Sequence, residues 1–155
     1  METTIEIGPM RSGEADALYA LTKRVAEKLV EKDFDPEGKS EFYGALDLIL
    51  NQKPENHLLL VARTADRPVG FIDIRSRFHI CLFFVDIGFH GQGIGRKLFE
   101  AALEKCMIGD NPTSMEVNSS LYAVPIYEAL GFKKRGGVQL LNGIRFMEMD
   151  FSQKK

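Results

Sequence analysis

The sequence predicts a mixed α/β fold, and two observations indicate it. Short apolar runs typical of strands are interleaved with segments whose apolar residues recur at helical spacing. The chain has 155 residues, of which 45% are hydrophobic, so it is long enough to bury a sizeable core. We therefore expect a single domain over residues 1–151, followed by a short tail over residues 152–155.

The first third of the chain predicts a strand and two amphipathic helices. The strand covers residues 4–10 and ends around Gly8-Pro9. The first helix follows Ser12, its expected N-cap, and its apolar side chains recur at helical spacing: Leu18, Leu21, Val25 and Leu29. The second helix covers residues 39–52, and one of its sides carries Phe42, Leu46, Ile49 and Leu50.

The middle of the chain predicts three strands and a third helix. Residues 57–65 and 68–76 form a hairpin closed by the polar pair Asp66-Arg67. Residues 78–88 are a continuous apolar run, which is typical of a central strand. The helix at residues 95–107 has one apolar face, formed by Leu98, Ala101, Ala102 and Cys106.

The last part of the chain predicts three more strands around a short helix. A break at residues 110–113 precedes a strand at residues 114–119. The helix carries Pro125 in its first turn and ends at Gly131, which suits a C-cap. Two final strands are expected at about residues 132–135 and 144–151.

Composition and charge exclude several classes of function. The net charge of −2 provides no overall basic field, so we expect no nucleic-acid partner. No apolar run approaches the ~20 residues of a membrane span, and the N-terminus lacks a signal-peptide pattern. The two cysteines, Cys81 and Cys106, are expected to be reduced, and no His/Cys spacing resembles a zinc site. We therefore expect a cytoplasmic protein without a metal or a membrane partner.

Three alternating glycines, Gly91, Gly93 and Gly95, lie where the central strand gives way to a helix. Such a junction presents unpaired N–H groups to an anion, and glycine lets the backbone come close to it. A P-loop is excluded because Gly95 is followed by Arg96 and Lys97, and the G-x-G-x-G spacing does not fit the dinucleotide fingerprint. A loop that holds a pyrophosphate remains, with a plain turn as the alternative.

Two stretches of the sequence resemble motifs of the GCN5-related N-acetyltransferases. Residues 82–104, "LFFVDIGFHGQGIGRKLFEAALE", resemble the family's acetyl-CoA motif, whose pattern falls on residues 90–95. Residues 117–132, "VNSSLYAVPIYEALGF", resemble its later motif, with Tyr127 followed by Gly131-Phe132. The stretches "FHICLFFVD" and "NGIRF" are similar to an uncharacterised bacterial subgroup.

The resemblance implies a fold and a cofactor. The fold would be a mostly antiparallel twisted sheet of about seven strands, splayed between the fourth and fifth strands and flanked by about four helices. Acetyl-CoA would be the co-substrate. His90 takes the place of the usual Gln or Arg, and Ser120 the place of a frequent Asn, so a weaker grip on the cofactor is expected at both. The implied cofactor-binding residues are Phe83, Phe84, Val85, His90, Gly91, Gln92, Gly93, Ile94, Gly95, Arg96, Asn118 and Ser120.

The reaction needs a neutral amine, a stabilised oxyanion and a protonated leaving thiol. By its place in the motif, Tyr127 is the acid for the thiol, with a half-buried structural tyrosine as the alternative. His79, Cys81 and Phe83 are expected to share one face of the fourth strand. His79 is the first candidate for the base and Asp73 the second, while some members of the family have no base. A structural histidine is the alternative for His79.

We therefore expect residues 1–151 to be an N-acetyltransferase domain that moves an acetyl group to a primary amine by direct attack in a ternary complex. A non-catalytic acyl-CoA-binding domain and a transferase of another acyl group are the alternatives. The acceptor is a small-molecule or peptide amine. An acidic cluster (Glu31, Asp33, Asp35, Glu37) is either a solvated connection or a sign of a cationic acceptor. A homodimer is left open, because dimers are common in the family.

Overall fold

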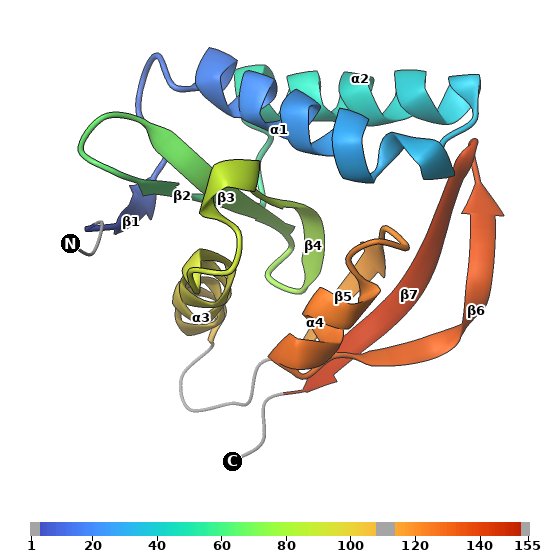
Figure 1. Cartoon of the computed structure of the whole chain (residues 1–155). Helices are drawn as coiled ribbons and strands as arrows, with labels where there is room; N and C mark the ends of the chain where they lie inside the picture. The colour runs from blue at the N-terminus through green and yellow to red at the C-terminus, as the bar shows by residue number, and fades with distance from the viewer. Residues whose placement is uncertain (1–3, 108–113, 153–155) are drawn as a thin grey trace.

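The computed structural model describes residues 4–107 and 114–152 (Figure 1). The break expected at residues 110–113 and residues 153–155 of the expected tail lie outside this range. The strands are β1 (Glu6–Pro9), β2 (His57–Arg63), β3 (Pro68–Arg75), β4 (His79–Val85), β5 (Ser114–Ser119), β6 (Lys133–Leu141) and β7 (Ile144–Ser152). The helices are α1 (Ala15–Leu29), α2 (Pro36–Gln52), α3 (Ile94–Cys106) and α4 (Val124–Leu130), with short 3₁₀ turns η1 (Glu31–Asp33) and η2 (Ile87–Phe89).

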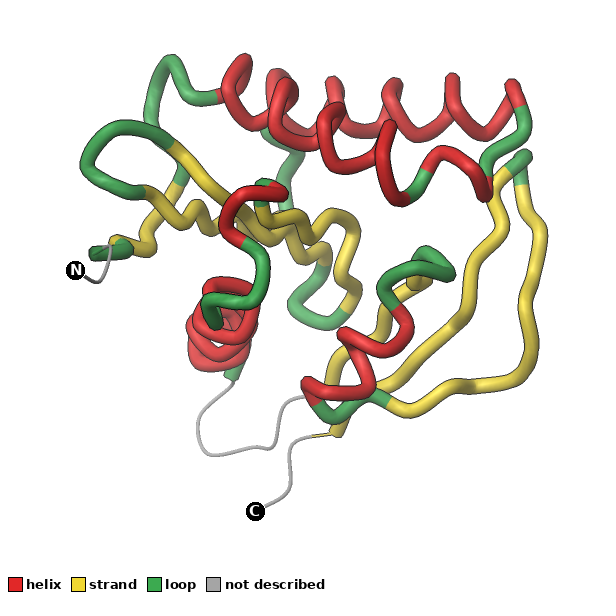
Figure 2. The backbone as a smooth tube through the Cα atoms, viewed as in Figure 1, coloured by secondary structure: helices red, strands yellow, loops and turns green. Residues whose placement is uncertain are grey.

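The strands form one seven-stranded sheet in the order β1-β2-β3-β4-β5-β7-β6. Neighbouring strands are antiparallel except for β4 and β5, which are parallel. These two strands pair through His79 with Glu116 and Ile80 with Val117, and they diverge beyond that point (Figure 2). The expected sheet, splayed between its fourth and fifth strands and flanked by four helices, is therefore confirmed.

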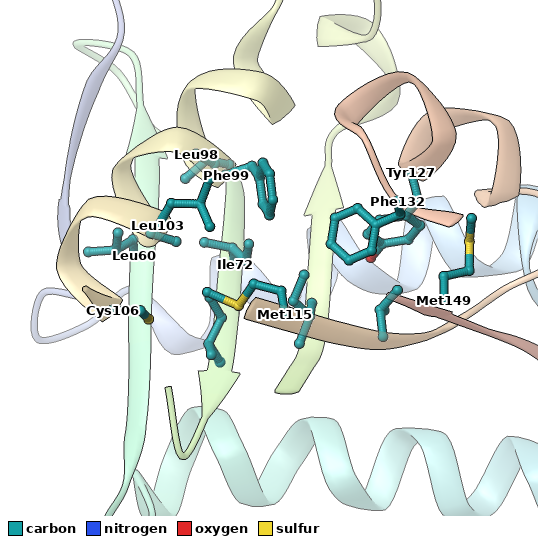
Figure 3. Close-up of a cluster of buried hydrophobic side chains, with 14 of the residues drawn as sticks. Leu60, Ile72, Leu98, Phe99, Leu103, Cys106, Met115, Tyr127, Phe132 and Met149 are labelled. Atoms are coloured by element: carbon teal, nitrogen blue, oxygen red, sulfur yellow. The ribbon is translucent and has the colours of Figure 1, made fainter. Parts of the chain in front are cut away.

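The two faces of the sheet carry separate apolar cores. Helices α1 and α2 lie on one face, where Leu18, Leu46 and Phe71 belong to one cluster of buried side chains (Figure 1). Helix α3 packs on β2 and β3 from the other face. There, Leu98 and Phe99 of α3 join Ile72 of the sheet in a cluster that extends to Tyr127 and Phe132 (Figure 3). No helix among the described residues is long and apolar enough to cross a membrane.

Helix boundaries show where the sequence predictions were right and wrong. The cap expected at Ser12 is wrong, because α1 begins at Ala15 with Glu14 as its N-cap. Gly13 has a φ of +86°, so the chain is still turning there and cannot be helical. Helix α2 begins earlier than expected, at Pro36, whose fixed φ suits a first turn. The C-cap at Gly131 is confirmed, with a left-handed φ of 109°.

Strand β4 contains a bulge at Cys81. Across β3 and β4, Asp73 pairs with Leu82 and Ile74 with Ile80, which leaves Cys81 without a partner. Ile80 and Phe83 consequently face the α3 core, whereas Cys81 and Leu82 both face the α1–α2 core. The expectation that Phe83 shares a face with His79 and Cys81 is therefore wrong, because the extra residue shifts the alternation.

Candidate active site

A cavity of about 1100 Å³ opens where β4 and β5 diverge. Its walls come from the end of β4, the start of α3, β5, α4, α2 and β7. Parallel strands that separate in this way leave their backbone groups and side chains accessible from both faces of the sheet. The expected cofactor loop, Tyr127 and His79 all line this one cavity.

The glycine loop places the start of α3 at the edge of the cavity. Gly91 has a φ of 77°, and Gly93, with a φ of 79°, is the N-cap of α3. The N–H of Lys97 donates to the carbonyl of Gly93 at 3.1 Å, so the N–H groups of residues 94–96 have no partner within the helix. These donors and the helix dipole favour an anion at this end of α3.

Two side chains of the loop hold its shape. The Nε2 of His90 donates to the carbonyl oxygen of Val85 at 2.6 Å, which ties the loop back to the end of β4. Arg96 donates to the carbonyl oxygen of Ala129 at 2.8 Å and so connects α3 to α4. Both residues also line the cavity, whereas Gln92 does not, and its amide donates to the carbonyl of Gly88 at 3.4 Å.

Asp86, at the start of the loop between β4 and α3, connects this loop to α1 and to the β2–β3 turn. Its carboxylate accepts hydrogen bonds from Arg24 of α1 and from Arg67 of the β2–β3 turn, each at 2.8 Å, and from the N–H of Ile87 at 3.0 Å. Burial acts to raise the pKa of Asp86, but the bonds from the two arginines outweigh it and hold the pKa below its ordinary value. The loop is therefore held in place before any ligand arrives.

The diverging strands provide the walls of the cavity. Phe83, Phe84 and Val85 line it from β4, and Asn118 and Ser120 line it from the end of β5. Asn118 is exposed to the cavity. The hydroxyl of Ser120 accepts the N–H of Ala123 at 3.2 Å, so Ser120 also shapes the turn that leads into α4.

Tyr127 lies deep in the cavity wall. Tyr127 is 6% exposed, and its ring packs edge-to-face against Phe132, with ring centroids 5.1 Å apart (Figure 3). It packs in the same way against Phe83, with ring centroids 6.0 Å apart. No hydrogen bond engages its hydroxyl group within the described part of the chain, and burial raises the pKa of the phenol. Tyr127 is consequently a protonated donor over the whole physiological range of pH.

His79 is paired with an acid on the neighbouring strand β5. Its Nδ1 lies 2.9 Å from Oε2 of Glu116, its register partner on β5. A carboxylate in this position fixes the orientation of the imidazole ring. The other ring nitrogen is not engaged by any described residue, and His79 lines the cavity.

A second histidine pair, which the sequence analysis missed, lies on the same side of the sheet. The Nδ1 of His57 lies 2.7 Å from Oδ2 of Asp73, whose side chain is wholly buried and whose Oδ1 has no partner. Burial raises the pKa of Asp73, with the bond from His57 acting in the opposite direction, and burial raises the pKa of Cys81 to about 11. Asp73 therefore reaches the cavity only through His57, which lines it.

This second pair is also the place where a metal ion would find ligands. Donor atoms of His57, Asp73 and Cys81 all lie within 4.8 Å of one another, and no other group among residues 4–107 and 114–152 meets that condition. Cys81 lies on the same face of the sheet as His57 and Asp73. Neither Cys81 nor Cys106 forms a disulfide.

Comparison with known proteins identifies the class of protein that this fold and cavity define. The family model described as "Acetyltransferase (GNAT) domain" matches residues 30–153. The peptidyl-lysine N-acetyltransferase YjaB of Salmonella typhimurium is 32% identical over 134 residues, which cover 85% of this chain and 86% of that protein. The chain therefore belongs to the GNAT family of acetyltransferases.

Solved structures agree with this assignment. The solution structure of apo-form YjaB from Escherichia coli aligns with a TM-score of 0.73 at 26% identity and covers 96% of this chain and 97% of that one. The PaiA N-acetyltransferase of Thermoplasma acidophilum, solved with coenzyme A, has the same fold, with a TM-score of 0.74 at 16% identity over 96% of this chain and 98% of that one. The predictions of the fold, the family and an acyltransferase are confirmed.

Proposed function

We propose that the chain is an N-acetyltransferase, formed by one domain over residues 1–151, that moves the acetyl group of acetyl-CoA to a primary amine by direct attack. The observation that carries this proposal is that the unpaired N–H groups of α3, the gap between β4 and β5, and Tyr127 all open into the same cavity. Acetyl-CoA requires three such features: an anion site for its pyrophosphate, a slot for its extended pantetheine arm, and a proton donor for its leaving thiolate.

The cofactor would enter along the α3 side. Its pyrophosphate would accept from the backbone of residues 91–96, where the positive φ of Gly91 and Gly93 turns the N–H groups outward. Its pantetheine arm would lie between β4 and β5, against Phe83–Val85 on one strand and Asn118 and Ser120 on the other. Gln92 would contribute its backbone rather than its side chain, since that side chain turns to Gly88.

The chemistry assigns a role to each polar group in the cavity. The lone pair of the amine attacks the thioester carbon, and an N–H of the splayed β4 stabilises the oxyanion. The nitrogen then gives its extra proton to His79, directly or through a water molecule, while Glu116 holds the imidazole ring. As the C–S bond breaks, Tyr127 donates its proton to the departing thiolate.

The first experiment measures the melting temperature with acetyl-CoA and then the release of CoA thiol with a panel of amines. At a hundred times its Kd, the cofactor should stabilise the fold by about 2.7 kcal/mol and raise the melting temperature by roughly 5–10 °C. No shift at millimolar acetyl-CoA would rule out the proposed cofactor. A shift without thiol release would favour the non-catalytic acyl-CoA-binding alternative, and a larger shift with a longer acyl-CoA would favour another acyl donor.

The remaining expectations stay part of this proposal. The cytoplasmic location rests on the two unpaired cysteines. The absence of a nucleic-acid or membrane partner rests on the net charge of −2 and on the lack of a long apolar run in the sequence. A homodimer remains open, as it was from the sequence.

A further inference from the structure

Four polar residues form a row across four strands on the α1–α2 face of the sheet. Arg75 of β3 pairs in register with His57 of β2 on one side and with His79 of β4 on the other, and His79 pairs with Glu116 of β5. Side chains in register on neighbouring strands lie on the same face of a sheet. His57, Arg75 and His79 all line the cavity, so the row forms part of its floor.

Arg75 is the member of this row without a partner of its own. His57 is held by Asp73 at 2.7 Å, and His79 is held by Glu116 at 2.9 Å. Within residues 4–107 and 114–152, no carboxylate lies within ion-pair distance of Arg75. An arginine that lines a cavity between two engaged histidines is a binding site for a planar anion such as a carboxylate.

The other charged residues around the cavity also favour an anionic group over a polycationic acceptor. Arg96 is committed to the carbonyl of Ala129, and Arg145 forms an ion pair with Asp35 at 3.1 Å. Glu41 is the one acidic residue among the described residues that line the cavity. A site with this balance of charge repels an acceptor that carries several positive charges.

The acidic cluster that could have indicated a cationic acceptor lies outside the cavity, because none of Glu31, Asp33, Asp35 and Glu37 lines it. Asp35 binds Arg145, and Glu31 accepts from Tyr43 and lies 3.6 Å from Lys39. The side chain of Asp33 is buried. Glu31 and Asp35 therefore serve contacts around η1 and α2 that lie away from the cavity lining.

Apart from Glu41, the cavity wall formed by α2 and its neighbourhood is apolar. Helix α2 contributes three aliphatic side chains and an aromatic ring that packs against Phe34 and Phe84, with centroids 5.2 Å and 5.9 Å away. Such a wall suits an apolar side chain of the acceptor rather than a charged one. The apolar α2 side chains that line the cavity are Phe42, Ala45, Leu48 and Ile49.

We propose that the acceptor is a free amino acid with an apolar or aromatic side chain, whose carboxylate binds Arg75 and whose α-amine is the nucleophile. The proposal rests on the proposed function, because it concerns the acceptor half of that cavity. The arginine that holds the carboxylate also disfavours the protonated form of the neighbouring amine, which must lose its proton to react. Polyamines and lysine side chains of basic peptides fit neither the apolar wall nor the cation.

The test compares acceptors that differ by one group. Protein saturated with CoA is titrated calorimetrically with L-phenylalanine, L-leucine, phenethylamine, spermidine and a lysine-containing peptide, and the same panel is assayed for CoA release from acetyl-CoA. Phenethylamine has the body and the amine of phenylalanine without its carboxylate. The charged hydrogen bond to Arg75 should make phenylalanine bind at least about tenfold more tightly than phenethylamine.

The variant Arg75→Gln should remove that tenfold difference while leaving the acetyl-CoA melting shift unchanged. Arg77→Gln is the matched control, because Arg77 lies two residues further along the chain, is exposed, and does not line the cavity. It should retain the full difference between phenylalanine and phenethylamine.

Three results would overturn the proposal: phenethylamine binding as tightly as phenylalanine, spermidine or the lysine peptide binding more tightly than both amino acids, or Arg75→Gln keeping the preference for the carboxylate. Each leaves the acetyl-CoA melting shift intact. A loss of that shift in the unaltered protein would instead contradict the proposed function, so the two failures are distinguishable.

Discussion

The two halves of the cavity are built in different ways. The proposed cofactor half comes mainly from one continuous stretch, in which β4, η2 and the glycine loop run into α3 within residues 79–106. The proposed acceptor half comes from a row across four strands, where His57 and Glu116 are 59 positions apart in the printed sequence. The first half is defined by local spacing, the second by strand register.

This difference determines how each half responds to change. A local loop depends on the backbone conformation of a few residues, and a single side chain of the wrong shape disrupts it. The row depends on the pairing of whole strands, which the apolar cores hold in place. Replacing one side chain of the row therefore removes the contribution of that side chain and leaves the strand pairing intact. The following predictions test that contrast, beginning with the largest expected effect.

The variant Gly93→Val should abolish acetyl-CoA binding, with Kd rising by at least about a hundredfold. Gly93 has a φ of +79°, a region that a β-branched residue enters only with strain, and it is the N-cap of α3, so a changed backbone there would displace the N–H groups proposed to bind the pyrophosphate. Calorimetry or the melting shift measures the loss. Gly137→Val in β6 is the control, since Gly137 has an ordinary φ and open space around it. Tight binding by a folded Gly93→Val protein would place the cofactor elsewhere.

The variant Tyr127→Phe should lower kcat by about a hundredfold and leave the Kd for acetyl-CoA within about twofold, because it removes a proton donor and little volume. Since burial raises the pKa of Tyr127, loss of its proton should not reduce turnover of the unaltered protein as the pH rises to about 9. A steady-state assay across pH checks both statements.

The control for Tyr127→Phe is Tyr19→Phe on α1, a tyrosine that packs on Tyr43 outside the cavity. Its turnover should match that of the unaltered protein. An unchanged kcat in Tyr127→Phe would show that the tyrosine is a packing residue, as its contacts with Phe83 and Phe132 would also allow.

The variant His79→Gln should lower kcat by about tenfold without altering acetyl-CoA binding. Glutamine can still donate to Glu116 but cannot take up the proton of the amine. His57→Gln is the direct comparison, because His57 belongs to the same row and is held by Asp73 in a similar way. A larger loss in His57→Gln than in His79→Gln would make His57 the base.

The sequence predicted the elements around the proposed cofactor half better than those around the proposed acceptor half, and the reason is physical. Amphipathic spacing placed α1 through Leu18, Leu21 and Val25, all of them buried, and the glycine spacing placed the loop before α3. Strand β6 was predicted too short, since its residues are exposed along its whole length and show no alternation. Its true extent, Lys133–Leu141, follows from pairing with β7 instead.

The acceptor row could not be derived because two irregularities set its register. A hairpin closed tightly on Asp66-Arg67 would place His57 opposite Ser76. The strands instead close on Arg63 and Pro68, and the register shift between Ala62 and Arg63 then places His57 opposite Arg75. On the next strand, the bulge at Cys81 brings His79 opposite Arg75. The pattern of apolar residues does not indicate either register shift, so the sequence did not predict that His57 and Arg75 belong to the row.

The bulge also gives β4 two phases of alternation within seven residues. Before it, odd-numbered positions face the proposed acceptor; after it, the odd-numbered positions Phe83 and Val85 face the α3 core. One strand thereby contributes odd-numbered side chains to both faces of the sheet, and the alternation of its side chains changes phase at Cys81. Relatives that lack or displace this single residue would present different side chains to the amine from an otherwise similar strand. Comparing acceptor sites across the family therefore requires alignment by the position of the bulge, not by counting residues from the glycine loop.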